Sequence, residues 1–268
     1  MKTFIVDAFT TTPYKGNPAG VCFPNSHLDD SQMLTVAQEL GLSETAFVKP
    51  TRHPDTYSIR YFSPKKEIPL CGHATLASAK VIFRNTSEKT IHFRTVEQLD
   101  LVVTAGHDKM TMEFPLYPTS PATVPMSMLK ALGLTQTTNT VFSEKNKIIL
   151  LEIDDRETLA ALKPDFAALI KTHDGINGVL VTAPSKGTEY DYHYRYFWPW
   201  AGTNEDPVTG GVQTFLAAYW SAKLGKTTMR AFQSSTRTGD MQVELHNQKV
   251  LVSSEAVIIL EGNILQFD

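Results

Sequence analysis

The sequence predicts an α+β fold with two pseudo-symmetric domains, each a mostly antiparallel sheet wrapped around one central buried helix. The segment "YSIRYFSP" at 57–64 recurs as "YHYRYFWP" at 192–199, with five of eight positions identical. "EIPLCG" at 67–72 then recurs as "EDPVTG" at 205–210, with Glu, Pro and Gly at equal spacing. A helix-like segment follows each copy and carries no charge before Lys80 or Lys223. Two matches in order indicate a repeat, and helices that are apolar nearly all round are buried.

The first half alternates strand and helix patterns. Strands are expected at 4–9 and 19–23 around a Pro/Gly-rich turn, and "DDSQMLTVAQELGL" at 29–42 has the acidic start, apolar spacing and late glycine of a helix. Further along, each of two strand patterns stops at a proline, and after the central helix a hairpin turns about "AGHD". The ranges are strands at 45–50, 57–64 and 90–96, the central helix at 73–83, and the hairpin at 99–114.

A proline-rich segment separates the halves. Residues 115–125 hold four prolines within 11 residues and show neither helical nor strand periodicity, which is typical of an interdomain linker. The domains are therefore expected at 1–116 and 120–268. After the linker the expected order is helix, strand, helix and strand, followed by the second copy of the repeat. These elements are expected at 125–134, 147–153, 156–171 and 178–184.

Composition excludes several classes of function. The 268 residues include 25 Lys plus Arg and 28 Asp plus Glu, for a net charge of −3, and no basic run marks a nucleic-acid or anionic-membrane surface. The chain has no window of roughly 20 apolar residues and opens without a signal-peptide pattern, so a cytoplasmic location is expected. Cys22 and Cys71 are too few for a disulfide framework or a structural zinc site. Small molecules or other proteins are the expected partners.

The repeated turns are candidates for binding an anion. The start of a helix offers unpaired backbone N–H groups and the positive end of the helix dipole, and two such turns facing one cleft could hold a substrate carboxylate. Gly72, Gly210 and Gly211 would let the substrate approach the backbone closely. The alternative is that these glycines only form a tight turn into a packed helix. Because the turn occurs twice, we favour the functional interpretation, with the site in the cleft between the halves.

Three side chains are candidates for acid/base chemistry. His73 stands in the first turn of the first central helix, where the helix dipole would disfavour its cation. Asp206 replaces Ile68 of the first copy. Glu44 follows a helix end; as an ordinary loop residue it would be exposed, but in a cleft its pKa would be raised and it would be a usable acid/base. Glu67 and its counterpart Glu205 are interpreted as structural.

Several motifs together resemble the PhzF family of phenazine-biosynthesis-like proteins. They are "VDAFT", "GNPAGV", "LSETAFV", "RYFSPKKEIPLCGHATLASA" and "GTNEDPVTGG" with "LAAYW", spread over nearly the whole chain. The resemblance implies the diaminopimelate epimerase-like fold, a homodimer and a biosynthetic role. It also implies a cofactor-independent isomerase, because the best-understood member moves a proton between carbons of a dihydro-hydroxyanthranilate with one glutamate.

By motif, the resemblance assigns the acid/base role to Glu44 and cleft positions to His73 and Asp206. Substrate contacts are implied for Gly72, Gly210 and Gly211, and more weakly for Asn17 in the "GNP" turn. The family's active member carries serine where this chain has Gly211, which puts the phenazine substrate itself in doubt. The fold also includes racemases with two catalytic cysteines. Here the counterpart of Cys71 is Thr209, so that mechanism is rejected and Cys71 is interpreted as a packed thiol.

Two functional hypotheses result. The first is a cofactor-independent isomerase or epimerase that moves a proton on a small carboxylic acid, with no cofactor and no metal. The second is a catalytically inactive protein of the same fold that binds small carboxylates. A cofactor enzyme is poorly supported, because the chain has neither a Walker loop nor a G-x-G-x-x-G between strand and helix.

Overall fold

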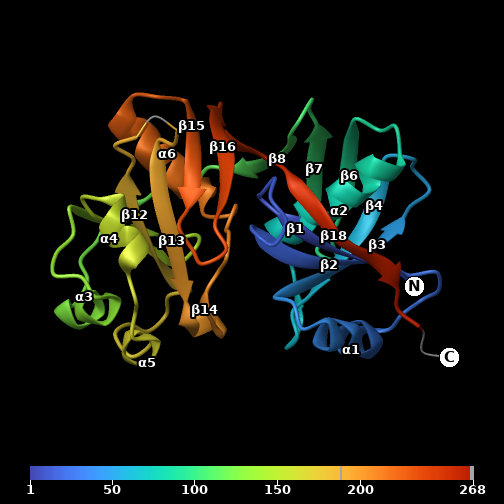
Figure 1. Cartoon of the computed structure of the whole chain (residues 1–268), viewed down its shortest axis with the longest axis horizontal. Coiled ribbons are helices and arrows are strands. Elements are labelled where there is room, and N and C mark those ends of the chain that lie inside the picture. Colours follow the sequence, from blue (N-terminus) through green and yellow to red (C-terminus); the bar gives the residue numbers. More distant parts are fainter. Residues whose placement is uncertain (188, 266–268) are drawn as a thin grey trace. The chain divides into compact units, whose positions relative to one another are not determined.

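The computed structural model describes residues 1–187 and 189–265, and the chain divides into two compact units (Figure 1). The first unit combines Met1–Glu113 with the segment that starts at Leu251, and the second is Phe114–Val250. Among the described helices, none has both the length and the apolar character needed to cross a membrane.

Helices and strands are mixed in both units, which confirms the α+β class. The helices are α1 (Asp30–Leu40), α2 (Gly72–Asn85), α3 (Met126–Leu132), α4 (Arg156–Ala161), α5 (Phe166–Leu169) and α6 (Gln213–Leu224), with a 3-10 turn η1 at Pro199–Ala201. The first unit contains β1 (Lys2–Ala8), β2 (Asn17–Phe23), β3 (Glu44–Pro50), β4 (Thr56–Phe62), β5 (Glu67–Ile68), β6 (Thr90–Arg94), β7 (Asp100–Ala105) and β18 (Ala256–Asn263).

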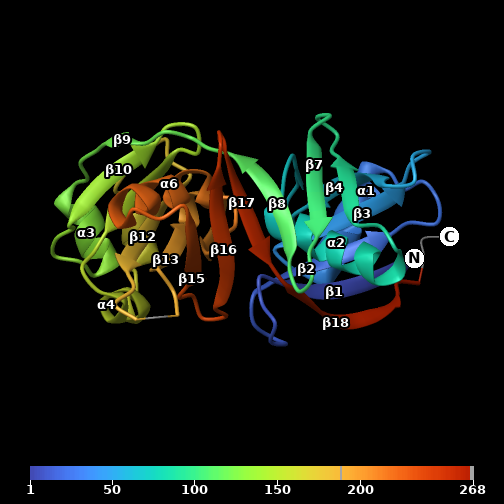
Figure 2. The ribbon, with the colours of Figure 1, turned by 90° about the horizontal axis from the view of Figure 1, so that it is seen from above.

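The second unit contains β9 (Ser120–Pro121), β10 (Asn139–Ser143), β11 (Ile148–Glu152), β12 (Gly178–Pro184), β13 (Tyr192–Trp198), β14 (Thr203–Glu205), β15 (Thr228–Gln233) and β16 (Gly239–His246). Two strands cross the division in the sequence and pair with each other, β8 (Met110–Pro115) and β17 (Lys249–Ser254), as Figure 2 shows.

The strand pairings of the two units repeat each other. In the first unit β2 runs parallel to β3, β3 antiparallel to β4, and β4 parallel to β6, with β5 folded back on β4. In the second unit β11, β12, β13, β14 and β15 pair in the same order and with the same directions. Seven further pairings, among them those of β1 with β2 and β18, are antiparallel, so antiparallel pairing predominates. The sequence repeat is therefore a repeat of structure.

The expected central helices are α2 and α6. Every residue of α2 from His73 to Ala79 is buried, and the helix packs against β1, β2, β3 and β18. In α6 the run from Gln213 to Ala217 is buried, together with Trp220. Their composition explains this, since neither segment offers a polar stripe that water could cover.

Three segments differ from the expected elements, each for a local reason. The helix expected at 156–171 is interrupted at Pro164, because proline lacks the N–H that a helix interior requires, and α4 and α5 result. The proline-rich segment at 115–125 contains β9, which pairs with β10. Finally, β18 pairs with β1 along its whole length, so the C-terminal strand belongs to the first unit although it follows the second in sequence.

Candidate functional site

Glu44 is the first residue of β3 and is buried. The chain leaves α1 at Gly41, whose φ of 63° forms the left-handed end of that helix. Two residues, Leu42 and Ser43, separate it from β3. Glu44 then pairs with Ala19 of β2, and only 6% of its surface is exposed. An ordinary loop glutamate would be solvated, so this burial contradicts the alternative of an exposed loop residue.

His73 lies directly against Glu44. It is the second residue of α2, and its Nε2 is 3.3 Å from Oε2 of Glu44, with both side chains 8% exposed. Burial lowers the pKa of His73 below its ordinary value, while the negative charge of Glu44 opposes the shift. A neutral imidazole that donates from Nε2 to the carboxylate fits this environment. The structure thus brings together two of the three acid/base candidates.

Two further side chains contact His73 that the sequence analysis did not assign to the site. Sγ of Cys71 lies 3.4 Å from Nδ1 of His73, and Oγ of Ser43 lies 3.5 Å from Nε2. Cys71 is buried, as expected of a packed thiol, but it packs against the imidazole. If Nε2–H points at Glu44, the Nδ1 lone pair can accept a hydrogen bond from the Cys71 thiol. The sequence offered one indication of these contacts: Ser43 is adjacent to Glu44, and Cys71 is two residues before His73.

The first turn of α2 has no side-chain cap. Its N-cap residue is Cys71, which makes no capping hydrogen bond, whereas α1, α4 and α5 are capped by Asp29, Asp155 and Asp165. The first N–H groups of a helix have no acceptor within the helix. The turn that begins at Gly72 therefore suits a bound anion.

Buried hydroxyl groups hold this turn in place. The hydroxyls of Tyr61 and Thr75 lie 2.6 Å apart, and Thr75 donates to the backbone oxygen of Cys71 at 2.7 Å. Tyr61, Thr75 and Cys71 are buried, so these two hydrogen bonds link the start of α2 to β4 without competition from water.

Asp206 occupies the corresponding turn of the second unit and is 7% exposed. Its Oδ2 accepts a hydrogen bond from the hydroxyl of Thr209. The side-chain amide of Gln233 bridges the turn, because Nε2 donates to the Asp206 backbone oxygen at 2.6 Å and Oε1 accepts from the Thr209 N–H at 2.7 Å. Both copies thus place an ionisable side chain against the residue at the Cys71 or Thr209 position.

The backbone angles at Gly72, Gly210 and Gly211 do not require glycine. The described glycines with positive φ are Gly16, Gly41, Gly133, Gly175, Gly202 and Gly225, and none of them lies in the repeated turn. At Gly211, a Cβ atom would meet nothing within 4 Å. Neither sterics nor backbone conformation therefore explains the absence of a side chain at Gly211.

Asn17 is the first residue of β2, opposite Ala8 of β1, and is completely buried. Its role as a substrate contact stays a prediction. Asp206, Gly210 and Gly211 belong to the second unit, whereas Glu44 and His73 belong to the first.

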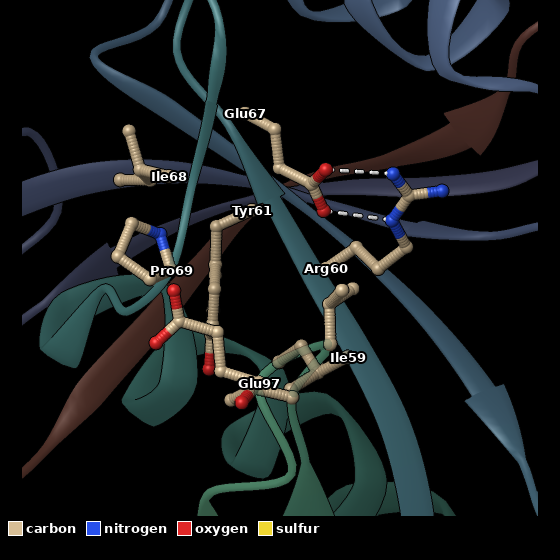
Figure 3. Close-up of a pocket in the computed structure, with 9 residues that line it drawn as sticks. Ile59, Arg60, Tyr61, Glu67, Ile68, Pro69 and Glu97 are labelled. Carbon is tan, nitrogen blue, oxygen red and sulfur yellow. Dashed lines mark hydrogen bonds and ion pairs between the residues drawn. The ribbon is translucent and has the colours of Figure 1, made fainter.

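The two repeated glutamates have a structural partner. Nε of Arg60 is 2.8 Å from Oε1 of Glu67 and Nη2 is 2.7 Å from Oε2, and Arg195 holds Glu205 in the same two-pronged way at 2.7 and 2.8 Å. Each glutamate is thus held by an arginine of the preceding strand, which agrees with the interpretation of Glu67 and Glu205 as structural. The first pair borders a pocket whose other walls include Tyr61, Ile68, Pro69 and Glu97 (Figure 3). Neither Glu44 nor His73 lines that pocket.

Comparison with known proteins agrees with this description. The family model for phenazine biosynthesis-like proteins, PhzC-PhzF, matches residues 6–262. An uncharacterized isomerase of Pseudomonas aeruginosa is 38% identical over 264 residues, which cover 97% of both chains. The crystal structure of a PhzF-family phenazine biosynthesis protein from Enterococcus faecalis superposes with a TM-score of 0.92 at 35% identity, over 99% of each chain.

A more distant likeness concerns the fold alone. A hydroxyproline epimerase from Agrobacterium vitis is 10% identical, with a TM-score of 0.58 over 98% of this chain and 91% of that one. The match over 257 of 268 residues (6–262) and the close relatives, by contrast, are decisive: the chain belongs to the phenazine biosynthesis-like, or PhzF, family.

Proposed function

We propose that the protein is a cofactor-independent isomerase or epimerase that moves a proton on a small carboxylic acid, with Glu44 as the acid/base. The observation that carries the proposal is the buried contact between Glu44 and His73 at the start of α2. A buried carboxylate held by an imidazole is in a position to accept a proton from a bound substrate. The relative from Pseudomonas aeruginosa, named as an isomerase, supports the same class of reaction.

The proposed reaction consists of two proton transfers. A C–H bond of the substrate breaks as the proton forms an O–H bond with the Glu44 carboxylate, and the electron pair enters the adjacent π system of the substrate. Glu44 then returns the proton to a different carbon, or to the other face of the same carbon. No electrons leave the substrate, and the enzyme ends in its starting protonation state.

His73 and the first turn of α2 would support this chemistry. The imidazole would orient the Glu44 carboxylate through Nε2, and the N–H groups from Gly72 onward would bind the substrate carboxylate and the negative charge that develops on it. Donors that are already in place need no reorganisation during the reaction, which is why such sites are effective.

The proposal extends to Asp206 and to the turn at Gly210 and Gly211 in the second unit. The basis is the repeat, which places this turn at the same position before a buried helix, together with the family motif. A carboxylate at Asp206 can hold a hydroxyl or amino group of the substrate. Asn17 is proposed as a further substrate contact on the family motif alone.

A heavy-water screen tests the proposal. The wild-type protein is incubated in heavy water with a panel of unsaturated, hydroxy and amino carboxylic acids, and each recovered acid is analysed by mass spectrometry and proton NMR. We expect deuterium at one carbon position of at least one acid. Replacement of Asp206 by Asn should slow that exchange. Glu67→Gln is the control, because Glu67 is interpreted as structural, and it should leave the exchange unchanged.

One observation favours a second candidate, a small-carboxylate-binding protein without activity. Gly211 lacks the hydroxyl that the family's active member has at this position, and the space beside it is open. Such a protein would bind the same acids with equal affinity in wild type and Glu44→Gln, and neither would exchange deuterium. Exchange in the wild type would rule this candidate out.

A further inference from the structure

Three different metal-ligating groups converge in the first unit. The carboxylate of Glu44, the thiol of Cys71 and the imidazole of His73 each offer a ligand atom, and these atoms all lie within 4.8 Å of one another. All three side chains are buried. The proposed proton transfer uses Glu44 and His73 but leaves the Cys71 thiol without a role.

The two spacings that involve His73 are close to those of a tetrahedral metal site. With bonds of about 2.0 Å to nitrogen and oxygen and about 2.3 Å to sulfur, a tetrahedral Zn²⁺ places nitrogen about 3.3 Å from oxygen and about 3.6 Å from sulfur. Nε2 of His73 lies 3.3 Å from Oε2 of Glu44 and 3.8 Å from Sγ of Cys71. The Glu44 oxygen and Sγ of Cys71 lie within 4.8 Å of each other, against about 3.6 Å in a tetrahedral site, so closure on the ion needs side-chain shifts of up to about 1 Å.

The donor set also selects among metals. Thiolate and imidazole bind Zn²⁺ and other soft or borderline divalent ions, whereas Mg²⁺ and Ca²⁺ prefer oxygen ligands only. Three protein ligands leave one tetrahedral position open.

We propose that Glu44, Cys71 and His73 form a Zn²⁺ site that inhibits the enzyme. Binding requires the His73 proton to move from Nε2 to Nδ1 and releases the Cys71 thiol proton to solvent; bonds then form from the metal to Sγ, Nε2 and a Glu44 oxygen, with no change of oxidation state. It occupies the Glu44 carboxylate, so the base can no longer accept a substrate proton. Inhibition rests on the proposed function, but metal binding does not.

The experiment measures binding without substrate. Full-length protein freed of metal by a chelator is titrated with ZnCl₂ by calorimetry, and with Co²⁺, whose thiolate complexes absorb in the near ultraviolet. We expect one ion per chain in the wild type and a cobalt–thiolate absorption band. Cys71→Ser should weaken Zn²⁺ binding at least tenfold and abolish the band. Cys22→Ala is the matched control, because Cys22 is likewise a buried cysteine outside any disulfide but packs in the core with residues of α1, and it should change neither.

Surface histidines provide the competing explanation. His107 with Asp108, and His92 with Asp100, could bind Zn²⁺ at the surface. Unchanged affinity in Cys71→Ser, or absence of the cobalt band in the wild type, would overturn the proposal. If Cys71→Ser does not fold, the wild type is tested instead. Alkylation of Cys71 is measured by peptide mass spectrometry with and without Zn²⁺. The ion should slow the reaction, and an unchanged rate would contradict the site.

The two proposals fail separately. Deuterium exchange that depends on Glu44, combined with no Zn²⁺ binding, would contradict only the metal site. Zn²⁺ binding that depends on Cys71, combined with no exchange in the wild type, would contradict only the isomerase.

Discussion

At the scale of single residues, the imidazole of His73 connects three groups of different chemistry. Its Nε2 faces the Glu44 carboxylate and the Ser43 hydroxyl, and its Nδ1 faces the Cys71 thiol. Burial lowers the pKa of His73 and so favours the neutral ring, which can donate from one nitrogen while it accepts at the other. The ring can thereby fix the position of the Glu44 carboxylate.

Replacing His73 by Asn tests this role. A hydrogen bond to a charged group contributes about 1.5–3 kcal/mol, so we expect deuterium exchange to fall by about ten- to a hundredfold. Ser43→Ala is the control: its 3.5 Å contact is longer, and the exchange rate should change less than threefold. Equal losses in both variants would contradict a specific role for the imidazole.

At the scale of elements, each repeat secures its turn with an Arg–Glu pair from the strand before it. The copies differ in burial: side-chain exposure is 23% and 31% for Arg60 and Glu67, but 8% and 16% for Arg195 and Glu205. Arg195 also donates to backbone oxygens at the end of α4. The second pair is therefore less screened by water and holds more of the surrounding chain.

The two pairs should differ in what they contribute to stability. Glu205→Gln leaves a buried guanidinium without its counter-charge and should lower the free energy of unfolding by about 3 kcal/mol. Glu67→Gln affects a more exposed pair and should cost about 1 kcal/mol. Denaturant unfolding of both variants measures the difference. Equal costs would show that burial of the pair does not matter.

The turn before α6 should accept a side chain at Gly211. Gly211→Ser places its Cβ in open space at a φ that any residue adopts, so the free energy of unfolding should stay within about 0.5 kcal/mol of wild type. Gly178→Ala is the contrast, because its Cβ would lie 2.6 Å from the backbone oxygen of Phe197, and it should destabilise the protein strongly. A large loss in Gly211→Ser would mean that the turn requires glycine.

At the scale of the whole molecule, the sequence allowed the repeat and the two buried helices to be predicted, because matched motifs and uncharged helical segments are visible in it. Glu44 and His73 were candidates by position, and the family motifs assigned them to one site. The sequence did not allow the assignment of β18, since its pairing with β1 joins residues about 260 positions apart and leaves no local trace. The contact of Cys71 with His73 was also missed: the sequence places them together but does not tell on which side of the helix start each side chain lies.

Two buried histidines, one in each unit, should make the protein sensitive to acid. Burial lowers the pKa of His73 and of His193 below 6.5, and Arg156 lowers that of His193 further. In the unfolded chain both titrate near 6.5, so below that pH the unfolded state binds more protons and the free energy of unfolding falls, until the folded-state pKa is reached.

Denaturant unfolding over a pH series above and below 6.5 checks this expectation. In His193→Gln, the free energy of unfolding should fall less steeply with decreasing pH below 6.5. Replacement of the exposed His107 by Gln should leave this dependence unchanged. Stability that is independent of pH in this range would contradict a lowered pKa in both histidines.

The central claim is that Glu44 transfers the proton, and one measurement tests it most directly. The acid that exchanges fastest in heavy water is incubated with wild type, Glu44→Gln and Glu67→Gln, after calorimetry has established that all three bind it. We predict that Glu44→Gln loses about 10²–10⁴-fold in deuterium incorporation, while Glu67→Gln, folded and at equal occupancy, exchanges at the wild-type rate. Exchange in Glu44→Gln at the wild-type rate would contradict the account.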